Sequence, residues 1–405
     1  MIDAAALDIF LGKTRVGTIA RLDGDASIFT FDEVYLADQD RPTLSLAYKD
    51  ANGEIIAETR SYRTKIEPFF SNLLPEGTLR DYLARRAGVK AVREYHLLTQ
   101  LGHDLPGAVR AVAVDAEETE ADELDEEAAG KQAERALRFS LAGVQLKFSA
   151  IKAQGKNGGL TIPVTGSGGD WIVKLPSARH PDVPEAEFAA MKLAAKIGID
   201  VPEIDLVPLD QIDGIPEGIT RYGESAFAIR RFDRGEEGPV HTEDFAQVFG
   251  VFADDKYENA SYRQILNVLA IETDEQSVVE FVRRLTYSVL IGNGDMHLKN
   301  WSLIYPDRRQ AALAPCYDFV STIAYIDDDK AALTFSRTMK FSGFSQDELS
   351  HLAANAGLSE KLVLGTARET VARFHEHWQA EKGNLPLTAD AIKAIEAHLH
   401  TVPIA

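Results

Sequence analysis

One short stretch near residue 295, together with an aspartate further along, constrains this chain more than any other feature. Residues 292–300 read GNGDMHLKN, so Asn300 follows Asp295 by five positions, and Asp318 comes after a segment that is typical of a β-hairpin. Phosphoryl transfer requires this spacing, because one acid accepts the proton of the attacking hydroxyl while an amide and a second acid hold Mg²⁺ against the phosphates of ATP. Each residue alone is a common turn residue. Together, after a long predicted helix, they predict a kinase-like active site.

The other parts of such a site are predicted earlier in the chain. Lys174 is a lone cation in the apolar strand WIVKLP, where it can grip phosphates or, alternatively, point into solvent from an edge strand. An acid on the next helix would hold that lysine, and we prefer Glu187 to Glu185, although both can be surface acids favoured by the helix dipole. The loop LAGVQLK at residues 141–147 carries one glycine and Lys147, a weaker signal than G-x-G-x-x-G.

His297 lies between the predicted base and the predicted metal ligand. An Asp-x-His pair can indicate a metal site, but no Cys/His cluster accompanies it in the sequence. We therefore interpret His297 as a residue that braces the loop.

The order of predicted elements divides the chain into four segments. Residues 1–113 alternate short strands with amphipathic helices and predict a small mixed α/β domain. Residues 114–136 predict an acidic linker, residues 137–230 the N-terminal lobe of a kinase with its phosphate loop, and residues 231–405 a helical C-terminal lobe. The predicted fold class is α+β, with a protein-kinase-like two-lobed core.

Local patterns also predict individual elements. The expectations that bear on the fold are strands at residues 27–36 and 43–48, and helices at residues 66–77, 184–198 and 242–252.

Composition limits the classes of partner. The net charge of −20 argues against direct, non-specific nucleic-acid binding, which needs a surplus of Lys and Arg. Nine of the thirteen residues from Asp115 to Glu127 are acidic, which favours a solvated tether over a docking tail for a basic partner. With Cys316 as the one cysteine, no intrachain disulfide can form. No apolar run is long enough to span a membrane and no signal peptide is recognisable, so we expect a cytoplasmic protein.

Several motifs give the chain a family resemblance along nearly its whole length. It resembles HipA-type serine/threonine kinases, the toxin components of bacterial type II toxin–antitoxin pairs. The motifs are NLLPEG at 72–77, LGHDLPGAV at 101–109, SLAGVQLK at 140–147, WIVKLP at 171–176, RFDR at 231–234, EDF at 243–245 and GNGDMHLKN at 292–300.

The resemblance implies a role for many of these residues. Asp295 would be the catalytic proton acceptor, Asn300 and Asp318 would hold Mg²⁺, Glu187 would support Lys174, and the backbone of residues 230–232 would meet adenine. The implied ATP-binding residues are Ala142, Gly143, Val144, Gln145, Leu146, Lys147, Lys174, Arg230, Arg231, Phe232, His297, Lys299, Asn300, Tyr317 and Asp318. Val144, Leu146 and Arg230 depart from what many relatives carry at these positions.

The resemblance also implies regulation and partners. Ser140 matches the position that family members autophosphorylate, which ejects the phosphate loop. A phosphate there would place about −2 charge beside Lys147 and the ATP phosphates. The implied protein substrate is a translation-related protein, in particular an aminoacyl-tRNA synthetase. The implied partner is a HipB-like DNA-binding antitoxin, through which the chain would reach operator DNA.

Two other functions stay open on the sequence. Small-molecule phosphotransferases share the Asp-x-x-x-x-Asn pattern, although the N-terminal segment and the Ser140 loop favour a protein kinase. The third hypothesis is a co-repressor that binds its antitoxin and DNA without catalysis. It gives the predicted active-site residues no function.

Overall fold

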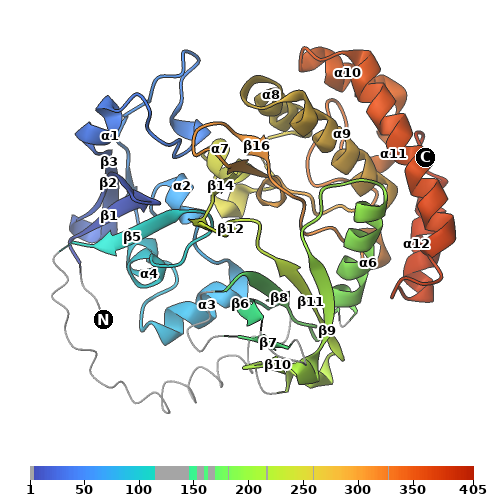
Figure 1. The fold of residues 1–405 in the computed structure, drawn as a ribbon, viewed down its shortest axis with the longest axis horizontal. Coiled ribbons are helices and arrows are strands. Elements are labelled where there is room, and N and C mark those ends of the chain that lie inside the picture. The colour runs from blue at the N-terminus through green and yellow to red at the C-terminus, as the bar shows by residue number, and fades with distance from the viewer. Residues whose placement is uncertain are drawn as a thin grey trace.

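The computed structural model divides into a mixed domain, a small sheet with one helix, and a helical lobe (Figure 1). The residues that it describes are 4–114, 146–152, 159–162, 169–180, 182–215, 218–258, 260–326 and 328–405. Ser140 and residues 142–145 of the predicted phosphate loop lie outside these ranges.

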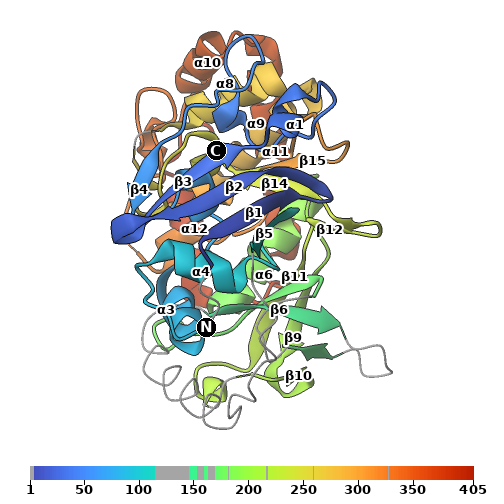
Figure 2. The same ribbon diagram turned by 90° about the vertical axis from the view of Figure 1, so that its left-hand side faces the viewer.

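The N-terminal domain is built on an antiparallel sheet, which faces the viewer in Figure 2. Its strands are β1 (Ala6–Leu11), β2 (Thr14–Leu22), β3 (Ala26–Phe31), β4 (Ser61–Arg63) and β5 (Val109–Ala113), in the order β4-β3-β2-β1-β5. Alternate residues of β1 are buried, as expected for a strand with one face on a core. The helices of this domain are α1 (Glu33–Ala37), α2 (Pro68–Ser71), α3 (Gly77–Arg86) and α4 (Glu94–Leu101).

A second sheet carries the lysine of the predicted site. Its strands are β6 (Lys147–Lys152), β7 (Leu160–Thr161), β8 (Trp171–Lys174), β9 (Ile204–Pro208), β10 (Ile212–Asp213) and β11 (Ser225–Arg230), in the order β10-β7-β6-β8-β11-β9. Helix α6 (Val183–Lys196) packs on β9 and β11 and begins one residue before the predicted range. Its acid lies in the first turn and Lys196 in the last, which suits the helix dipole.

The C-terminal lobe surrounds one buried helix. α9 (Glu275–Leu290) buries most of its side chains and packs against α8 (Tyr262–Glu272) and α11 (Glu360–Glu381), with α10 (Gln346–Asn355) and α12 (Ala389–Leu399) further out (Figure 1). Asp274 starts α9 because its side chain accepts a hydrogen bond from the Ser277 amide. The remaining strands and α-helix of the described residues are β12 (Arg234–Gly235), β13 (Gly238–Pro239), β14 (His241–Asp244), α7 (Phe245–Val248), β15 (Ser302–Tyr305) and β16 (Ala312–Leu313).

Polar side chains in three cases, and a proline in the fourth, end or redirect elements that periodicity predicts as longer or different. The Asp32 carboxylate accepts hydrogen bonds from the amides of Val34 and Tyr35, so the predicted strand 27–36 stops at Phe31 and α1 begins. Ser45 caps a short 3-10 turn, Leu46–Tyr48, within the predicted strand 43–48.

The other two corrections concern predicted helices. Pro75, which has no amide hydrogen, lies between α2 and α3, so residues 66–77 do not form one helix. In the predicted helix 242–252, residues up to Asp244 pair with β15 as a strand, and helix α7 starts only at the Asp244–Gln247 capping box.

A buried carboxylate fastens the N-terminal domain to the end of the second sheet. Asp233 accepts hydrogen bonds from the Gly107 amide at 2.8 Å, from the Arg231 guanidinium at 2.8 and 2.9 Å, and from Arg234 at 2.9 Å. Arg234 also reaches Asp104 at 2.8 Å. The RFDR and LGHDLPGAV motifs are therefore two halves of one contact.

A second buried carboxylate joins the same domain to the C-terminal lobe. Glu243 of β14 is 1% exposed and accepts hydrogen bonds from the Ser45 hydroxyl at 2.5 Å, the Leu46 amide at 3.0 Å and the Tyr305 hydroxyl at 2.5 Å. The three donors compensate for the burial of the carboxyl group.

Replacing Asp233 tests the first of these contacts. The Asp233→Asn variant removes the buried negative charge that pairs with Arg231 and Arg234 and leaves them only Asp104, so we expect it to lower the free energy of unfolding by about 3 kcal/mol. Urea unfolding measures the loss, and amide hydrogen exchange of residues 101–109 locates it. Asp210→Asn, at an exposed aspartate, is the matched control and should change stability by less than about 0.5 kcal/mol. Equal stability of the two variants would contradict the role given to Asp233.

Candidate functional site

The site is organised around a buried lysine that touches two acids, one on the next helix and one far along the chain. The Lys174 ammonium on β8 contacts Glu187 of α6 and Asp318, which follows β16. Lys174 is 7% exposed and Glu187 3%. Glu185, the other acid considered from the sequence, lies beside Ser225 instead. Lys174 is therefore directed into the protein and not into solvent.

The charges of this cluster are set by burial and by mutual attraction. Burial alone would lower the pKa of the Lys174 ammonium, but Asp318 and Glu187 outweigh it and hold that pKa above its ordinary value. Burial opposes ionisation of Asp318, yet Lys174 and Lys147 keep the pKa of this carboxyl well below its usual range. Burial raises the pKa of Glu187 to about 7 against the pull of Lys174. Asp318 is therefore the firmly ionised carboxylate of the pair.

Asp318 reaches this position through an uncommon backbone conformation. Its φ of 57° lies in the left-handed region, which side chains other than Asn and Asp rarely adopt. Such conformations persist where the surrounding structure compensates for them, often at functional sites. Here the contact with Lys174 is that compensation.

The predicted base and the predicted amide ligand lie in one closed loop. Asn300 donates a hydrogen bond from Nδ2 to the Asp295 carbonyl oxygen at 2.8 Å, and the His297 amide donates to the same oxygen at 2.8 Å. Gly292, with φ of 62°, lets the chain leave α9 and turn into this loop. Since the Asn300 nitrogen is used within the loop, its amide oxygen is the atom that can bind a cation.

The Asp295 carboxylate faces a tyrosine that the sequence did not single out. The Tyr257 hydroxyl donates to Asp295 Oδ1 at 2.5 Å. Burial raises the pKa of the Asp295 carboxyl above its ordinary value, against the Tyr257 hydrogen bond and with added repulsion from Asp318. Burial and nearby Lys256 lower the pKa of His297 to about 3, so its ring is neutral. It packs edge-to-face on Tyr257, with ring centroids 4.9 Å apart.

Lys299 connects the loop to the N-terminal domain. Its ammonium donates to the Asn72 carbonyl oxygen at 2.9 Å, to the Asn72 side chain at 3.0 Å and to Asp244 at 2.9 Å. Glu76 lies 3.5 Å from Lys299 and accepts a hydrogen bond from Lys256 at 2.9 Å. Asn72 and Glu76 both belong to the NLLPEG motif. The motif was recognised in the sequence, but the part of these two residues in the site was not.

The predicted hinge lies at the end of β11. The amides of Arg230 and Arg231 donate to the carbonyl oxygens of Glu203 at 2.8 Å and Asp170 at 2.7 Å. The Phe232 ring lies 5.8 Å from the Tyr317 ring, with 31° between their planes. The structure thus brings Phe232 and Tyr317 together, while the Arg231 side chain turns away to Asp233.

Two residues of the predicted phosphate loop are described. Leu146 is buried and its carbonyl oxygen accepts a hydrogen bond from the Leu175 amide at 2.8 Å, and Lys147 lies opposite Lys174 in the β6–β8 pairing. Lys147 is therefore close to the cluster of Lys174, Glu187 and Asp318.

The described residues fit a cation that takes few protein ligands. Among them, no group of three or more His, Cys, Asp or Glu side chains could hold a metal ion. Mg²⁺ commonly binds one or two carboxylates and completes its shell with phosphate oxygens and water. An ionised Asp318 and the Asn300 amide oxygen suit that pattern.

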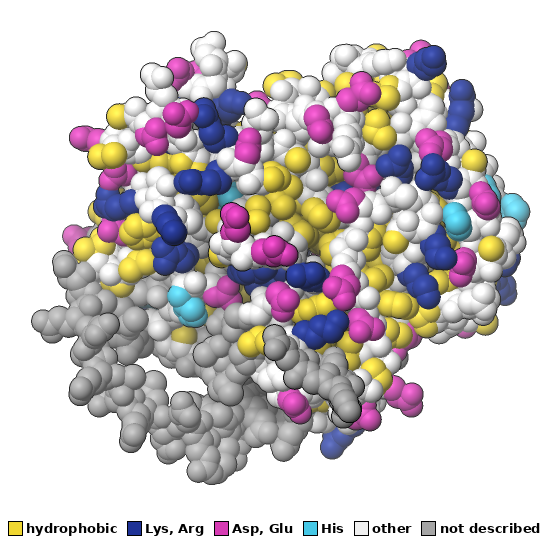
Figure 3. Space-filling view, viewed as in Figure 1, with side chains coloured by type: hydrophobic (Ala, Val, Ile, Leu, Met, Phe, Trp, Pro, Cys, Tyr) yellow, Lys and Arg dark blue, Asp and Glu magenta, His cyan; other side chains and the backbone are white. Residues whose placement is uncertain are grey.

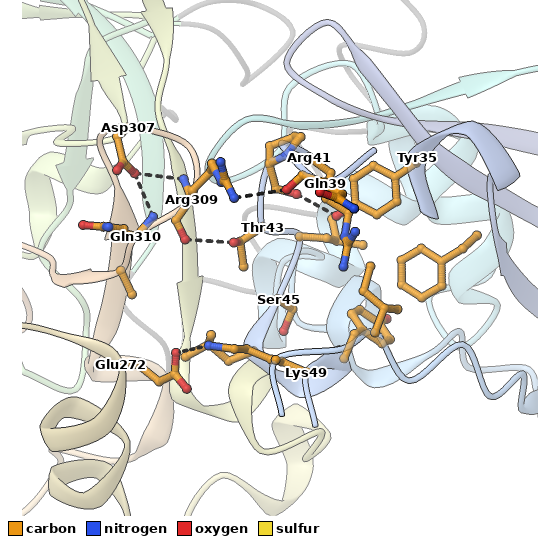
Figure 4. Close-up of a pocket in the computed structure, with 18 residues that line it drawn as sticks. Tyr35, Gln39, Arg41, Thr43, Ser45, Lys49, Glu272, Asp307, Arg309 and Gln310 are labelled. Carbon is orange, nitrogen blue, oxygen red and sulfur yellow. Dashed lines mark hydrogen bonds and ion pairs between the residues drawn. The ribbon is translucent and has the colours of Figure 1, made fainter. Parts of the chain in front are cut away.

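A cavity elsewhere does not belong to this site. It has a volume of about 540 Å³ and lies at the seam between the N-terminal domain and the C-terminal lobe (Figure 4). Its polar lining is largely paired, as in the contacts of Lys49 with Glu272 at 2.5 Å and of Arg309 with Asp40 at 2.6 Å. None of its lining residues is a member of the Asp295 site.

The charges on the surface and the apolar character of the helices bear on two expectations from composition, one about nucleic-acid binding and one about a membrane span. On the face shown in Figure 3, the described Lys and Arg side chains lie among Asp and Glu side chains. Across the part of the chain that the structure describes, no helix has the length and apolar character to cross a membrane.

Comparison with known proteins gives consistent matches. Residues 7–112 match the HipA N-terminal domain family, and residues 139–378 match the HipA-like C-terminal domain family. A Sinorhizobium fredii protein named "Putative kinase Y4dM" is 56% identical over 405 residues, which cover 100% of this chain and 98% of that protein. The "Serine/threonine-protein kinase toxin HipA" of Shewanella oneidensis is 24% identical over 403 residues, or 91% of this chain and 87% of that protein.

A solved structure is similar in fold. It is the Shewanella oneidensis MR-1 complex of HipA, HipB and its operator DNA, with a TM-score of 0.72 and 22% identity over 98% of this chain and 95% of that chain. The likeness confirms the predicted α+β, kinase-like architecture.

Two substitutions test the charge balance around Lys174. Lys174→Met leaves Glu187 and Asp318 facing each other, which should cost about 3–5 kcal/mol of unfolding free energy at pH 8. Glu187→Gln keeps the Lys174–Asp318 pair and should cost about 1–2 kcal/mol.

The pH dependence of the Lys174→Met variant follows from the same cluster. Without the cation the folded-state pKa values of both carboxyls rise, so stability is retained at low pH and lost as pH rises through those values. Urea unfolding at pH 5.5 and pH 8 should show the larger deficit at pH 8. A deficit of equal size at both pH values would contradict this electrostatic account.

Proposed function

The chain belongs to the HipA family, and we propose from this and from its Asp295 site that it is an ATP-dependent protein serine/threonine kinase. The observation that carries the proposal is the contact of Lys174 with Asp318 and Glu187, beside the closed loop of Asp295 and Asn300. A kinase needs each of these groups to position ATP and to neutralise charge.

Each side chain has a distinct role in the proposed reaction. Lys174 binds the phosphates of ATP, and Asp295 accepts the proton of the attacking serine hydroxyl as the bond to the γ-phosphorus forms and the bond to ADP breaks. Asn300 and Asp318 hold Mg²⁺, which supplies charge neutralisation at the phosphates when bound. Glu187 holds Lys174 in position.

The nucleotide is proposed to lie between the two lobes. Its adenine meets the backbone of residues 230–232 and the Phe232–Tyr317 aromatic pair, and its phosphates meet residues 142–147. The centroids of these two rings lie 5.8 Å apart with the ring planes tilted to each other, and this arrangement supports a role in packing against a planar base. His297 and Lys299 act by shaping the loop that carries Asp295.

We further propose that the kinase is the toxin of a toxin–antitoxin pair. The name of the Shewanella oneidensis relative and the HipA, HipB and operator DNA complex with a similar fold support this biological role. The partner would be a HipB-like antitoxin that carries the chain to operator DNA, and the substrate would be a translation-related protein such as an aminoacyl-tRNA synthetase.

Removal of the proposed base is the central test. Asp295→Asn should lower ³²P transfer from Mg-ATP to protein by about 10²–10⁴-fold, because the proton acceptor is lost. The exposed-site variant Asp210→Asn should keep wild-type activity. Incubation with a lysate separates the acceptor classes, since label in a protein band supports a protein kinase and label only in small molecules indicates a small-molecule phosphotransferase. Full activity of Asp295→Asn would overturn the assignment.

The pH profile of the wild-type enzyme gives a second readout. Asp295 accepts a proton only when ionised, and its pKa is raised by burial. The rate should therefore fall as pH decreases, beginning at a higher pH than an ordinary aspartate with pKa near 3.8 would show. Initial rates between pH 4.5 and pH 8 measure this. A rate independent of pH over that range would contradict a general-base role for Asp295.

Ser140 is proposed as a regulatory phosphorylation site. Mass spectrometry after incubation with Mg-ATP should find phosphate on the Ser140 peptide and a parallel loss of kinase activity. The Ser140→Ala variant should stay active under the same treatment. An unmodified Ser140 peptide in a preparation that remains fully active would exclude the switch.

A further inference from the structure

Tyr257 makes the hydrogen bond to Asp295 that the hydroxyl group of a phosphoryl acceptor would need to make. Its hydroxyl donates to Asp295 Oδ1 at 2.5 Å. A general base in phosphoryl transfer takes its proton from a hydroxyl at hydrogen-bond distance, about 2.6–3.2 Å. The Tyr257 hydroxyl thus lies where a serine hydroxyl or a water molecule would approach Oδ1 of Asp295.

The protein holds this tyrosine from several sides. The carbonyl oxygen of the preceding Lys256 accepts a hydrogen bond from the Leu298 amide at 3.3 Å. The Lys256 ammonium is paired with Glu76 of the N-terminal domain at 2.9 Å and lies 5.7 Å from the centre of the Tyr257 ring. The ring also packs on His297. Residues of both the N-terminal domain and the C-terminal lobe therefore fix the position of the Tyr257 hydroxyl.

The residue can nevertheless be displaced from outside. Tyr257 is 45% exposed, whereas the carboxylate that it covers is largely buried. Burial, followed by the Asp295 hydrogen bond and charge, raises the pKa of the phenol. The phenol therefore remains a hydrogen-bond donor to Asp295.

We propose that Tyr257 is a positioning residue that occupies the acceptor position on Asp295 until a substrate hydroxyl displaces it. This rests on the proposed kinase function. While it is in place, Tyr257 keeps Oδ1 of Asp295 from accepting a proton from water. In the reaction that it suppresses, water oxygen bonds to the γ-phosphorus, the bond to ADP breaks, and the water proton passes to Asp295.

Hydrolysis of Mg-ATP without a protein acceptor measures this role directly. Tyr257→Phe keeps the ring and removes the hydroxyl, so phosphate release should rise about tenfold, the equivalent of one hydrogen bond to a charged group. With dephosphorylated casein as the acceptor, KM should fall by a similar factor while kcat changes little.

A matched variant controls for the loss of a tyrosine hydroxyl. Tyr62 packs its ring on Phe252, with centroids 5.8 Å apart, next to the segment that carries Tyr257. Tyr62→Phe should leave both hydrolysis and casein phosphorylation at wild-type rates. A purely structural role for Tyr257 would lower kcat and hydrolysis together.

The outcomes separate this inference from the proposed function. If the wild type phosphorylates casein or lysate protein but Tyr257→Phe hydrolyses ATP no faster, the inference is wrong and the kinase assignment stands. If the wild type transfers no phosphate to protein and Asp295→Asn changes nothing, the kinase assignment itself fails. Phosphate found on Tyr257 after incubation with Mg-ATP would make the residue an acceptor and would overturn its role as a place-holder.

Discussion

The contact of the Lys174 ammonium with two carboxylates is the interaction on which the site depends. It joins β8 and the following helix α6 to the segment after β16, which lies more than a hundred residues further along the chain. A buried charge is unfavourable unless it is paired, so the three segments must assemble together. Because Asp318 also has a left-handed backbone, the position of the predicted metal ligand is set by this pairing and not by local chain preference.

The N-terminal domain also supports the segments around Asp295. Lys299, in the loop that carries Asp295, is held by Asn72, and Lys256, next to Tyr257, is held by Glu76. Asp233 closes a further contact where β11 ends. Each is a buried or half-buried polar group with a partner in the other domain, so separating the domains would remove these hydrogen bonds, including the Lys256–Glu76 ion pair beside Tyr257.

The sequence alone indicated the site residues that lie close to one another along the chain. Asp295, Asn300 and Asp318 follow from a pattern within one stretch of chain, and Lys174 with Glu187 from a strand followed by a helix. Tyr257, Asn72 and Glu76 could not be found in this way, because their importance arises only when distant segments meet. Local errors had a similar cause: the side chains of Asp32 and Asp244 bind nearby amides and override hydrophobic periodicity.

The buried core of the N-terminal domain draws on residues from Ala4 to Ala111, one continuous run at the start of the chain. Domains generally fold as units during synthesis, so this one can be complete before the ribosome has made the loop that it supports. The loop that carries Asp295 then forms against a surface that already exists. A protein that recognises only the N-terminal domain would meet the nascent chain while Asp295 is still untranslated.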